Sequence, residues 1–152
     1  MKIYKRYSKG GFTLTELMIV IAVLAILAAV AIPVVSNIIN TAVLSTANQN
    51  AGTLDMFIKE AQTHISVKDT SVYGAPVSSR TLTIGDVVQT QHLEKACETY
   101  TYKGRNIACV WNVPSDGVRL MYLDDNTDVE SGVLLINYQI IDETNTTLIV
   151  GL

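Results

Sequence analysis

Residues 12–35 read FTLTELMIVIAVLAILAAVAIPVV, and this stretch decides how the rest of the chain is organised. From Leu17 to Val35 every side chain is apolar, and no charged residue occurs between Leu17 and Leu54. The nineteen residues of the run form a helix about 28 Å long, which is close to the roughly 30 Å hydrocarbon core of a bilayer. The composition therefore predicts a helix that crosses a membrane once.

A basic leader precedes the apolar run. Residues 1–11 contain four Lys or Arg side chains and no Asp or Glu, and positive charge before a membrane helix stays on the cytoplasmic side. The rest of the chain is then expected outside the cytoplasm. It holds seven basic side chains against fourteen acidic ones. Because such a surface repels phosphate, we expect no bulk binding of nucleic acid.

Three interpretations of this N-terminus compete. A secretory signal fits the basic start, with Ala29-Val30-Ala31 as its cleavage site, but its apolar region would be too long and would begin beside Glu16. A plain membrane anchor fits the length, yet it gives Glu16 no purpose, and an acid within a membrane segment is costly. The third interpretation makes Glu16 functional, which is the default for an ionisable residue in such a segment.

The order of residues here resembles the class III signal of type IV pilins and type II secretion pseudopilins. Gly10-Gly11 is followed by Phe12, hydroxyl residues, Glu16 and the apolar run. The resemblance implies that a membrane peptidase cleaves between Gly11 and Phe12 and N-methylates Phe12. It also implies that Glu16 of one subunit meets the α-amino group of Phe12 on its neighbour, which offsets part of the cost of desolvating the carboxylate. Glu16 would then register one subunit against the next.

Pro33 lies within the apolar run and disturbs the helical backbone there. It removes one helical hydrogen bond and favours a kink or a loosened turn. The resemblance implies that the stretch from about Ala25 to Pro33 melts when the subunit leaves the membrane for a filament. A simple kink explains Pro33 equally well, so both interpretations stay open.

Beyond the apolar run, hydrophobic residues recur every three or four positions with polar residues between them, which indicates an amphipathic helix. The apolar positions are Ile39, Val43, Ala47, Ala51, Leu54, Ile58, Ala61 and Ile65. Joined to the apolar run, they predict one helix from about Phe12 to Ile65, roughly 80 Å long and too long to lie inside a domain of this size. We therefore expect its first half to protrude and to pack elsewhere.

After Ser66 the composition changes to residues typical of strands and turns. Gly85-Asp86 is expected to cap a short helix through Leu93, and Lys103–Asn106 is expected to form a hairpin turn. The predicted strands are 98–102, 107–111, 118–123 and 133–141, with a fifth candidate at 147–150. The sequence thus predicts an α+β fold in which about four antiparallel strands pack on the rear half of the long helix.

These predictions divide the chain into three parts. They are a cleaved leader at 1–11, an apolar transmembrane or filament-core helix at 12–35, and a globular domain at 36–152. Within that domain the helix runs to about 66, a surface connection covers 67–84 and the sheet lies in 95–152.

The two cysteines, Cys97 and Cys109, flank the predicted hairpin. On the oxidising side of a membrane, a disulfide that closes this loop would stabilise the domain by about 3 kcal/mol. Two free buried thiols are the alternative. We predict the disulfide.

Side-chain oxygens alternate in an acidic segment near the C-terminus. Asp124, Asn126, Asp128 and Glu130 resemble part of a calcium loop. The segment lacks the glycine at which an EF-hand turns sharply, and a solvated acidic loop is the commoner explanation. We therefore predict no cofactor and keep calcium as a secondary candidate.

The chain offers little for catalysis, because neither His64 nor His92 has a partner at metal or nucleophile spacing, and both are expected on the surface. We predict a structural subunit of a type IV pilus with a role in adhesion, motility or a related surface function. The precursor would cross the bacterial cytoplasmic membrane once and then join an extracellular filament. Its expected partners are identical and related subunits, the prepilin peptidase and the assembly machinery. The alternatives are a secretion or competence pseudopilin, and a membrane-anchored extracytoplasmic binding or enzymatic domain that never polymerises.

Overall fold

The computed structural model describes residues 10–67, 71–73, 82–113, 117–145 and 149. Its longest element is α1, Leu14–Ser66, which confirms the predicted long helix. The chain divides into two compact units, Met1–Ile39 and Asn40–Leu152. Each unit is described separately below.

In the first unit, every described residue is exposed to solvent. Its helical part contains Pro33, and the helix continues through this residue. The Ser36 hydroxyl donates to the carbonyl of Ile32, 3.1 Å away. The helix of this unit therefore carries an apolar surface that nothing in the unit covers.

In the second unit, the rear half of α1 contributes one face to the core. Ala47, Leu54, Ile58 and Ala61 are at most 1 % exposed, and their spacing of seven, four and three residues places them on one side of a helix. These positions confirm the predicted amphipathic pattern. Ile39, which we included in that pattern, is 56 % exposed and lies in the first unit.

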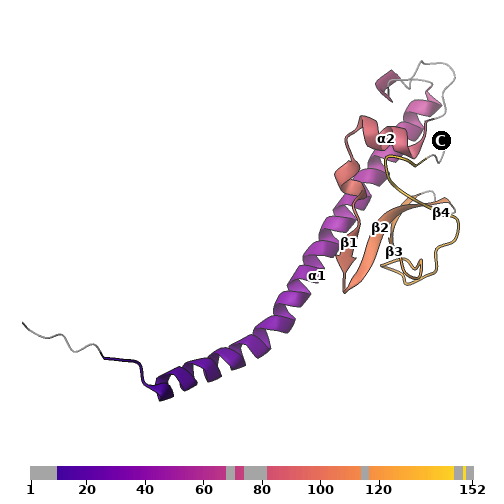
Figure 1. The fold of residues 1–152 in the computed structure, drawn as a ribbon. Coiled ribbons are helices and arrows are strands. Elements are labelled where there is room, and N and C mark those ends of the chain that lie inside the picture. The colour runs from indigo at the N-terminus through magenta and orange to yellow at the C-terminus, as the bar shows by residue number, and fades with distance from the viewer. Residues whose placement is uncertain (1–9, 68–70, 74–81, 114–116, 146–148, 150–152) are drawn as a thin grey trace, which may run out of the picture. The chain divides into compact units, whose positions relative to one another are not determined.

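The sheet has β2, Arg105–Asn112, at its centre and lies along the rear half of α1 (Figure 1). All three neighbouring strands run antiparallel to β2. They are β1, Tyr100–Tyr102, β3, Gly117–Tyr122, and β4, Tyr138–Ile140. β1 pairs with the first residues of β2 and β4 with its last three, while β3 pairs along its length. β1 and β4 therefore share one edge of β2, and β3 occupies the other edge.

The two faces of β2 are both buried. Ile107, Cys109 and Trp111 belong to the core cluster that includes α1. Ala108 and Val110 alternate with them and face the other way, yet they are only 2 % and 0 % exposed. Because β3 and β4 lie on opposite sides of β2, the connection between them has to cross one face of the sheet. We infer that part of the connection 123–137 covers the face that carries Ala108 and Val110, whereas Val129 packs against the core that includes α1.

The hairpin turn is shorter than the predicted Lys103–Asn106, and the backbone angles explain why. Lys103 and Gly104 have φ angles of 50° and 76°, and two consecutive residues with positive φ are what a tight type I′ hairpin requires. Arg105 and Asn106, which we placed in the turn, are instead the first two residues of β2.

The prediction for the fourth strand was too long. Only Tyr138–Ile140 pairs with β2, whereas Leu134 bridges to Thr127 within the crossing segment. The apolar residues before β4 therefore belong to the segment that crosses the sheet and do not pair with β2. The fifth candidate strand lies outside the described residues except for Ile149, whose N–H donates to Leu82 O over 2.8 Å.

A short helix, α2, Ile84–Thr90, contacts the segment that follows β4. Thr83 and Asp86 form a capping box at its start, and the helix ends before the predicted Leu93. A 3₁₀ turn, Glu94–Cys97, follows it. The Gly85 N–H donates to Asn145 O over 2.9 Å, so α2 and the segment after β4 are joined directly.

Candidate functional site

The predicted cleavage segment is accessible in the structure. Residues 10–13 precede α1 without regular secondary structure. A Cβ added at Gly10 or Gly11 would have no neighbouring atom within 4 Å, and Phe12 is 89 % exposed. A peptidase needs an unfolded peptide that it can reach from several sides, and the bond between Gly11 and Phe12 meets this requirement.

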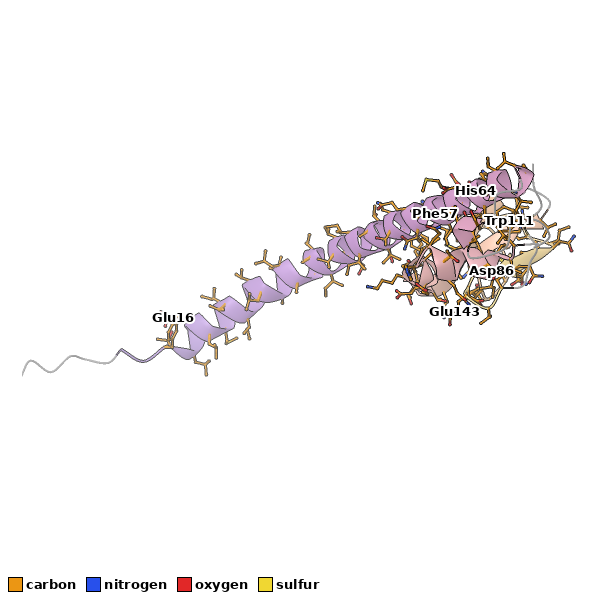
Figure 2. The ribbon with its side chains drawn as sticks, turned by 90° about the horizontal axis from the view of Figure 1, so that it is seen from above. Glu16, Phe57, His64, Asp86, Trp111 and Glu143 are labelled. Carbon is orange, nitrogen blue, oxygen red and sulfur yellow. The ribbon has the colours of Figure 1, made fainter. Side chains whose placement is uncertain are left out.

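Glu16 lies at the beginning of α1 (Figure 2) and closes the helix terminus together with Thr13. The N–H of Thr13 donates to Glu16 Oε2 over 2.8 Å, and the Thr13 hydroxyl donates to the same oxygen over 2.9 Å. In return, the Glu16 N–H donates to Thr13 Oγ1 over 3.2 Å. Threonine before a helix and glutamate three residues later form a capping box, which satisfies N–H groups that a helix start leaves unpaired.

This capping box corrects the expectation that a plain membrane anchor gives Glu16 no purpose, because the carboxylate has a structural role within one chain. The signal was present as Thr13-Leu14-Thr15-Glu16, a hydroxyl residue followed three positions later by an acid. Among the described residues, both hydrogen bonds to the carboxylate end on Oε2. Glu16 Oε1 therefore remains able to accept a bond from another molecule while the cap is intact.

The apolar surface that follows Glu16 is long enough to cross a bilayer. Within the described residues, α1 is the one helix that meets the length and hydropathy of a membrane span, with a mean hydropathy of 3.1 in its most apolar stretch. Exposed side chains such as Leu24, Ile26 and Ile32 are 57–69 % accessible. Pro33 lies in this surface, so two of the residues predicted for assembly, Glu16 and Pro33, belong to α1, and the third, Phe12, lies two residues before it.

Cys97 and Cys109 come from different elements and are both free thiols in the structure. The Cys97 thiol donates to Leu93 O over 3.4 Å, and the Cys109 thiol contacts Ala96 O at 3.8 Å. Burial raises the pKa of Cys97 to about 11, and the charges of Asp142 and Glu94 add to this shift. Burial also raises the pKa of Cys109 to about 12, with a contribution from Cys97. The predicted disulfide is thus absent here, although the two thiols are near enough to influence each other.

In the described part of the chain, no three His, Cys, Asp or Glu side chains gather as metal ligands, in the acidic segment or elsewhere. Asp124 instead accepts a 2.7 Å bond from Arg105 Nε, and this bond lowers the pKa of Asp124. Asp128 is 5 % exposed and accepts from the backbone N–H groups of Glu130 and Ser131 at 3.0 and 2.7 Å. Asn126 takes a positive φ of 57°. The carboxylates of Asp124 and Asp128 therefore have separate partners.

The two histidines lie apart from any recognisable catalytic arrangement among the described residues. His64 packs its ring edge-on against Tyr73, with centroids 5.9 Å apart, and is 3.9 Å from Glu60. His92 lies in the turn after α2 with a φ of 54°. We expected His64 on the surface, but it is half-buried because Tyr73 covers it.

An accessible glycine–phenylalanine bond, an acid at the head of the helix and an uncovered apolar helix are the features on which the predicted processing and assembly rest. The family model of the prokaryotic N-terminal methylation motif matches residues 6–32 of this chain. The chain carries a class III signal peptide of the pilin and pseudopilin type, and this motif supports a type IV pilin-like or pseudopilin protein. No curated protein and no solved structure gives a significant match.

The motif also implies processing by a prepilin peptidase and assembly into pilus-like structures. Proteins with this motif are structural and not enzymatic. Together with the apolar helix, it is consistent with membrane anchoring followed by assembly at the surface.

Proposed function

We propose that this chain is the structural subunit of a type IV pilus. The peptidase cleaves between Gly11 and Phe12 and methylates Phe12, and the apolar face of α1 then moves from the bilayer into the core of a helical filament. The observation that carries the proposal is that the methylation motif, residues 6–32, leads into a helix whose apolar surface is not covered by anything else in the first unit. Identical or related subunits are the occupants that such a surface needs once it leaves lipid.

The geometry of Glu16 supports a role in registering subunits. Its Oε2 holds the helix start and its Oε1 is available. The protonated amine that cleavage creates on Phe12 of a neighbouring subunit would bind Oε1, and this pairing compensates both charges in apolar surroundings. One ion pair between Glu16 and the Phe12 amine of the neighbouring subunit would then set the position of each added subunit.

A matched pair of variants separates the charge from the cap. Glu16→Gln keeps an oxygen that accepts hydrogen bonds at the third helical position, so the cap is retained, but it removes the negative charge. Thr13→Ala removes the capping hydroxyl and retains the charge. We expect both precursors to insert and to be cleaved, because the leader and the apolar run are unchanged. Sheared filaments should become scarce for Glu16→Gln and remain abundant for Thr13→Ala.

Electron microscopy and immunoblotting of sheared and membrane fractions measure this outcome. Filaments made only of Glu16→Gln subunits at normal yield and length would show that the charge does not register subunits. Loss of filaments in both variants to the same extent would show that assembly also needs the capping hydroxyl of Thr13, so that the charge of Glu16 is not sufficient for registration.

We further propose that Cys97 and Cys109 form a disulfide in the exported protein. The support is their position on packed neighbouring elements and the influence of Cys97 on the pKa of Cys109. Because thiolates are scarce at neutral pH when both pKa values are raised, oxidation would have to occur before the domain finishes folding.

A further inference from the structure

The bond that the peptidase is expected to cleave lies directly before the start of α1. Residues 10–13 have no regular secondary structure, and the helix begins at Leu14. Phe12 lies two residues before this start. A helix that began one turn earlier would therefore include the bond between Gly11 and Phe12.

The conformation of this bond matters for cleavage. Proteolysis occurs at exposed chain that is not held in secondary structure, and a bond inside a helix must first be unwound locally. The residue at which the helix stops therefore decides whether the bond between Gly11 and Phe12 is ready for a peptidase or has to be unwound.

The capping box and a longer helix compete for the same backbone donors. In the structure, the Glu16 N–H donates to Thr13 Oγ1 over 3.2 Å. In a helix that continued toward the N-terminus, this N–H would instead donate to Phe12 O, four residues earlier. The Thr13 N–H, which donates to Glu16 Oε2 over 2.8 Å, would likewise be needed for a helical bond. The two arrangements exclude each other, so the capping box keeps Phe12 out of the helix.

The location of the helix start makes an unpaired N–H costly. The apolar run begins at Leu17, directly after Glu16, and belongs to the helix that can span a membrane. Lipid offers no acceptor to a backbone N–H, so such groups pair within the chain. Without the Thr13 hydroxyl, the chain can pair them by winding the preceding residues into the helix. The two glycines before Phe12 oppose this winding only moderately, because glycine weakens a helix without breaking it.

We propose that Thr13 is a positioning residue for the processing reaction. Its hydroxyl ends the helix at Leu14 and thereby keeps the bond between Gly11 and Phe12 extended for the peptidase. This inference rests on the proposed function, in which that bond is cleaved. Loss of a cap of ordinary strength shifts a conformational equilibrium by about fivefold. Cleavage without the cap should therefore be slower and still run to completion, so filaments of Thr13→Ala subunits stay abundant.

Cleavage of the full-length precursor by a purified prepilin peptidase in detergent micelles tests this role. Thr13→Val has a shape close to that of threonine but no hydroxyl, and it should slow cleavage by about two- to fivefold. Thr13→Ser and Thr13→Asn both retain an oxygen that caps helices well, and they should be cleaved at the rate of the unmodified chain.

Thr15→Val is the matched control. It makes the same change two positions later, at a hydroxyl that forms no hydrogen bond in the described part of the chain. It should leave the rate of cleavage unchanged, and equal slowing in Thr15→Val and Thr13→Val would overturn the proposal.

Two other outcomes would also overturn the proposal. One is a Thr13→Val precursor that is cleaved as fast as the unmodified chain. The other is slow cleavage of Thr13→Asn with normal cleavage of Thr13→Ser, because the peptidase would then recognise the hydroxyl and not the end of the helix. In both cases the unmodified chain is cleaved and the proposed function stands. If the unmodified precursor is not cleaved between Gly11 and Phe12, the proposed function itself is wrong.

The backbone conformation of the uncleaved precursor gives an independent readout. Selective carbon-13 labelling of glycine and phenylalanine reports residues 11 and 12 through their Cα chemical shifts in micelles. We expect extended values in the unmodified chain and in Thr13→Ser, and a shift of the Phe12 signal toward helical values in Thr13→Val. Slow cleavage of Thr13→Val with unchanged chemical shifts would contradict a longer helix as the cause.

Discussion

Replacing Gly85 with alanine tests the close packing of residues 143–145 against α2. A Cβ at this position would lie 2.6 Å from Glu143 O, 2.9 Å from Asn145 O and 3.2 Å from Asn145 N. Carbon–oxygen contacts normally begin at about 3.3 Å, and all three neighbours are backbone atoms that cannot rotate away. The segment would have to retreat by about 0.7 Å at its nearest atom, which also strains the 2.9 Å bond from Gly85 N–H to Asn145 O.

We expect Gly85→Ala to lower the free energy of unfolding by about 1–3 kcal/mol, the range for overpacking a well-filled site. For a unit of this size the midpoint of thermal unfolding should fall by about 4–12 °C. The fluorescence of Trp111, the single and nearly buried tryptophan, reports the second unit in the full-length chain in detergent micelles.

Gly52→Ala is the matched control. Gly52 lies within α1, and a Cβ added there would have no neighbouring atom within 4 Å. Alanine should therefore stabilise the helix by about 0.5–1 kcal/mol. If Gly85→Ala leaves the midpoint unchanged or raises it as Gly52→Ala does, the close approach of residues 143–145 to α2 is wrong.

Three further outcomes are expected. Leu54→Ala should lower the free energy of unfolding by about 3–5 kcal/mol, because its fully buried side chain leaves a cavity between α1 and the sheet; a loss under about 1 kcal/mol would place Leu54 outside the core. Exported filaments denatured without reductant should show no alkylated cysteine, and alkylation of both Cys97 and Cys109 would overturn the disulfide. Arg105 lowers the pKa of Asp124, so the pair stabilises the fold above about pH 4 and loses this contribution as the pH falls further. Asp124→Asn should accordingly show a shallower decrease of the unfolding midpoint on acidification than the unmodified chain, and equal slopes would contradict the pairing.

The long helix was predictable because its signal is local and repeated. An apolar run from Leu17 to Val35 continues into a pattern with a helical period from Ile39 to Ile65, with no charge between Leu17 and Asp55. The predicted ends of the helix fall within two residues of Leu14–Ser66. The capping box at Thr13 carries an equally local signal, but the same carboxylate also suggests a charge role, and the charge role alone was predicted. One local pattern therefore led to the correct prediction of the helix, and a second one, the capping box, was present in the sequence but was not used.

The crossing segment was less predictable because its partners are distant or irregular. Val133 and Leu134 have strand-forming side chains, yet their backbone partners belong to the preceding acidic turn and not to β2. Asp124 looked like a metal ligand because the sequence does not show that Arg105, nineteen positions earlier, reaches it. Such choices depend on which elements come together, and no local pattern encodes them.

The mass of the subunit in sheared surface filaments tests the central claim most directly. If the chain is processed at the methylation motif and then assembles, the intact mass should equal that of residues 12–152 with one added methyl group, and fragmentation should place the methyl on the amine of Phe12. A filament subunit that begins at Met1 would contradict processing. A secreted product that begins at Ile32, with no filaments, would show an ordinary secretory signal and would contradict the account as a whole.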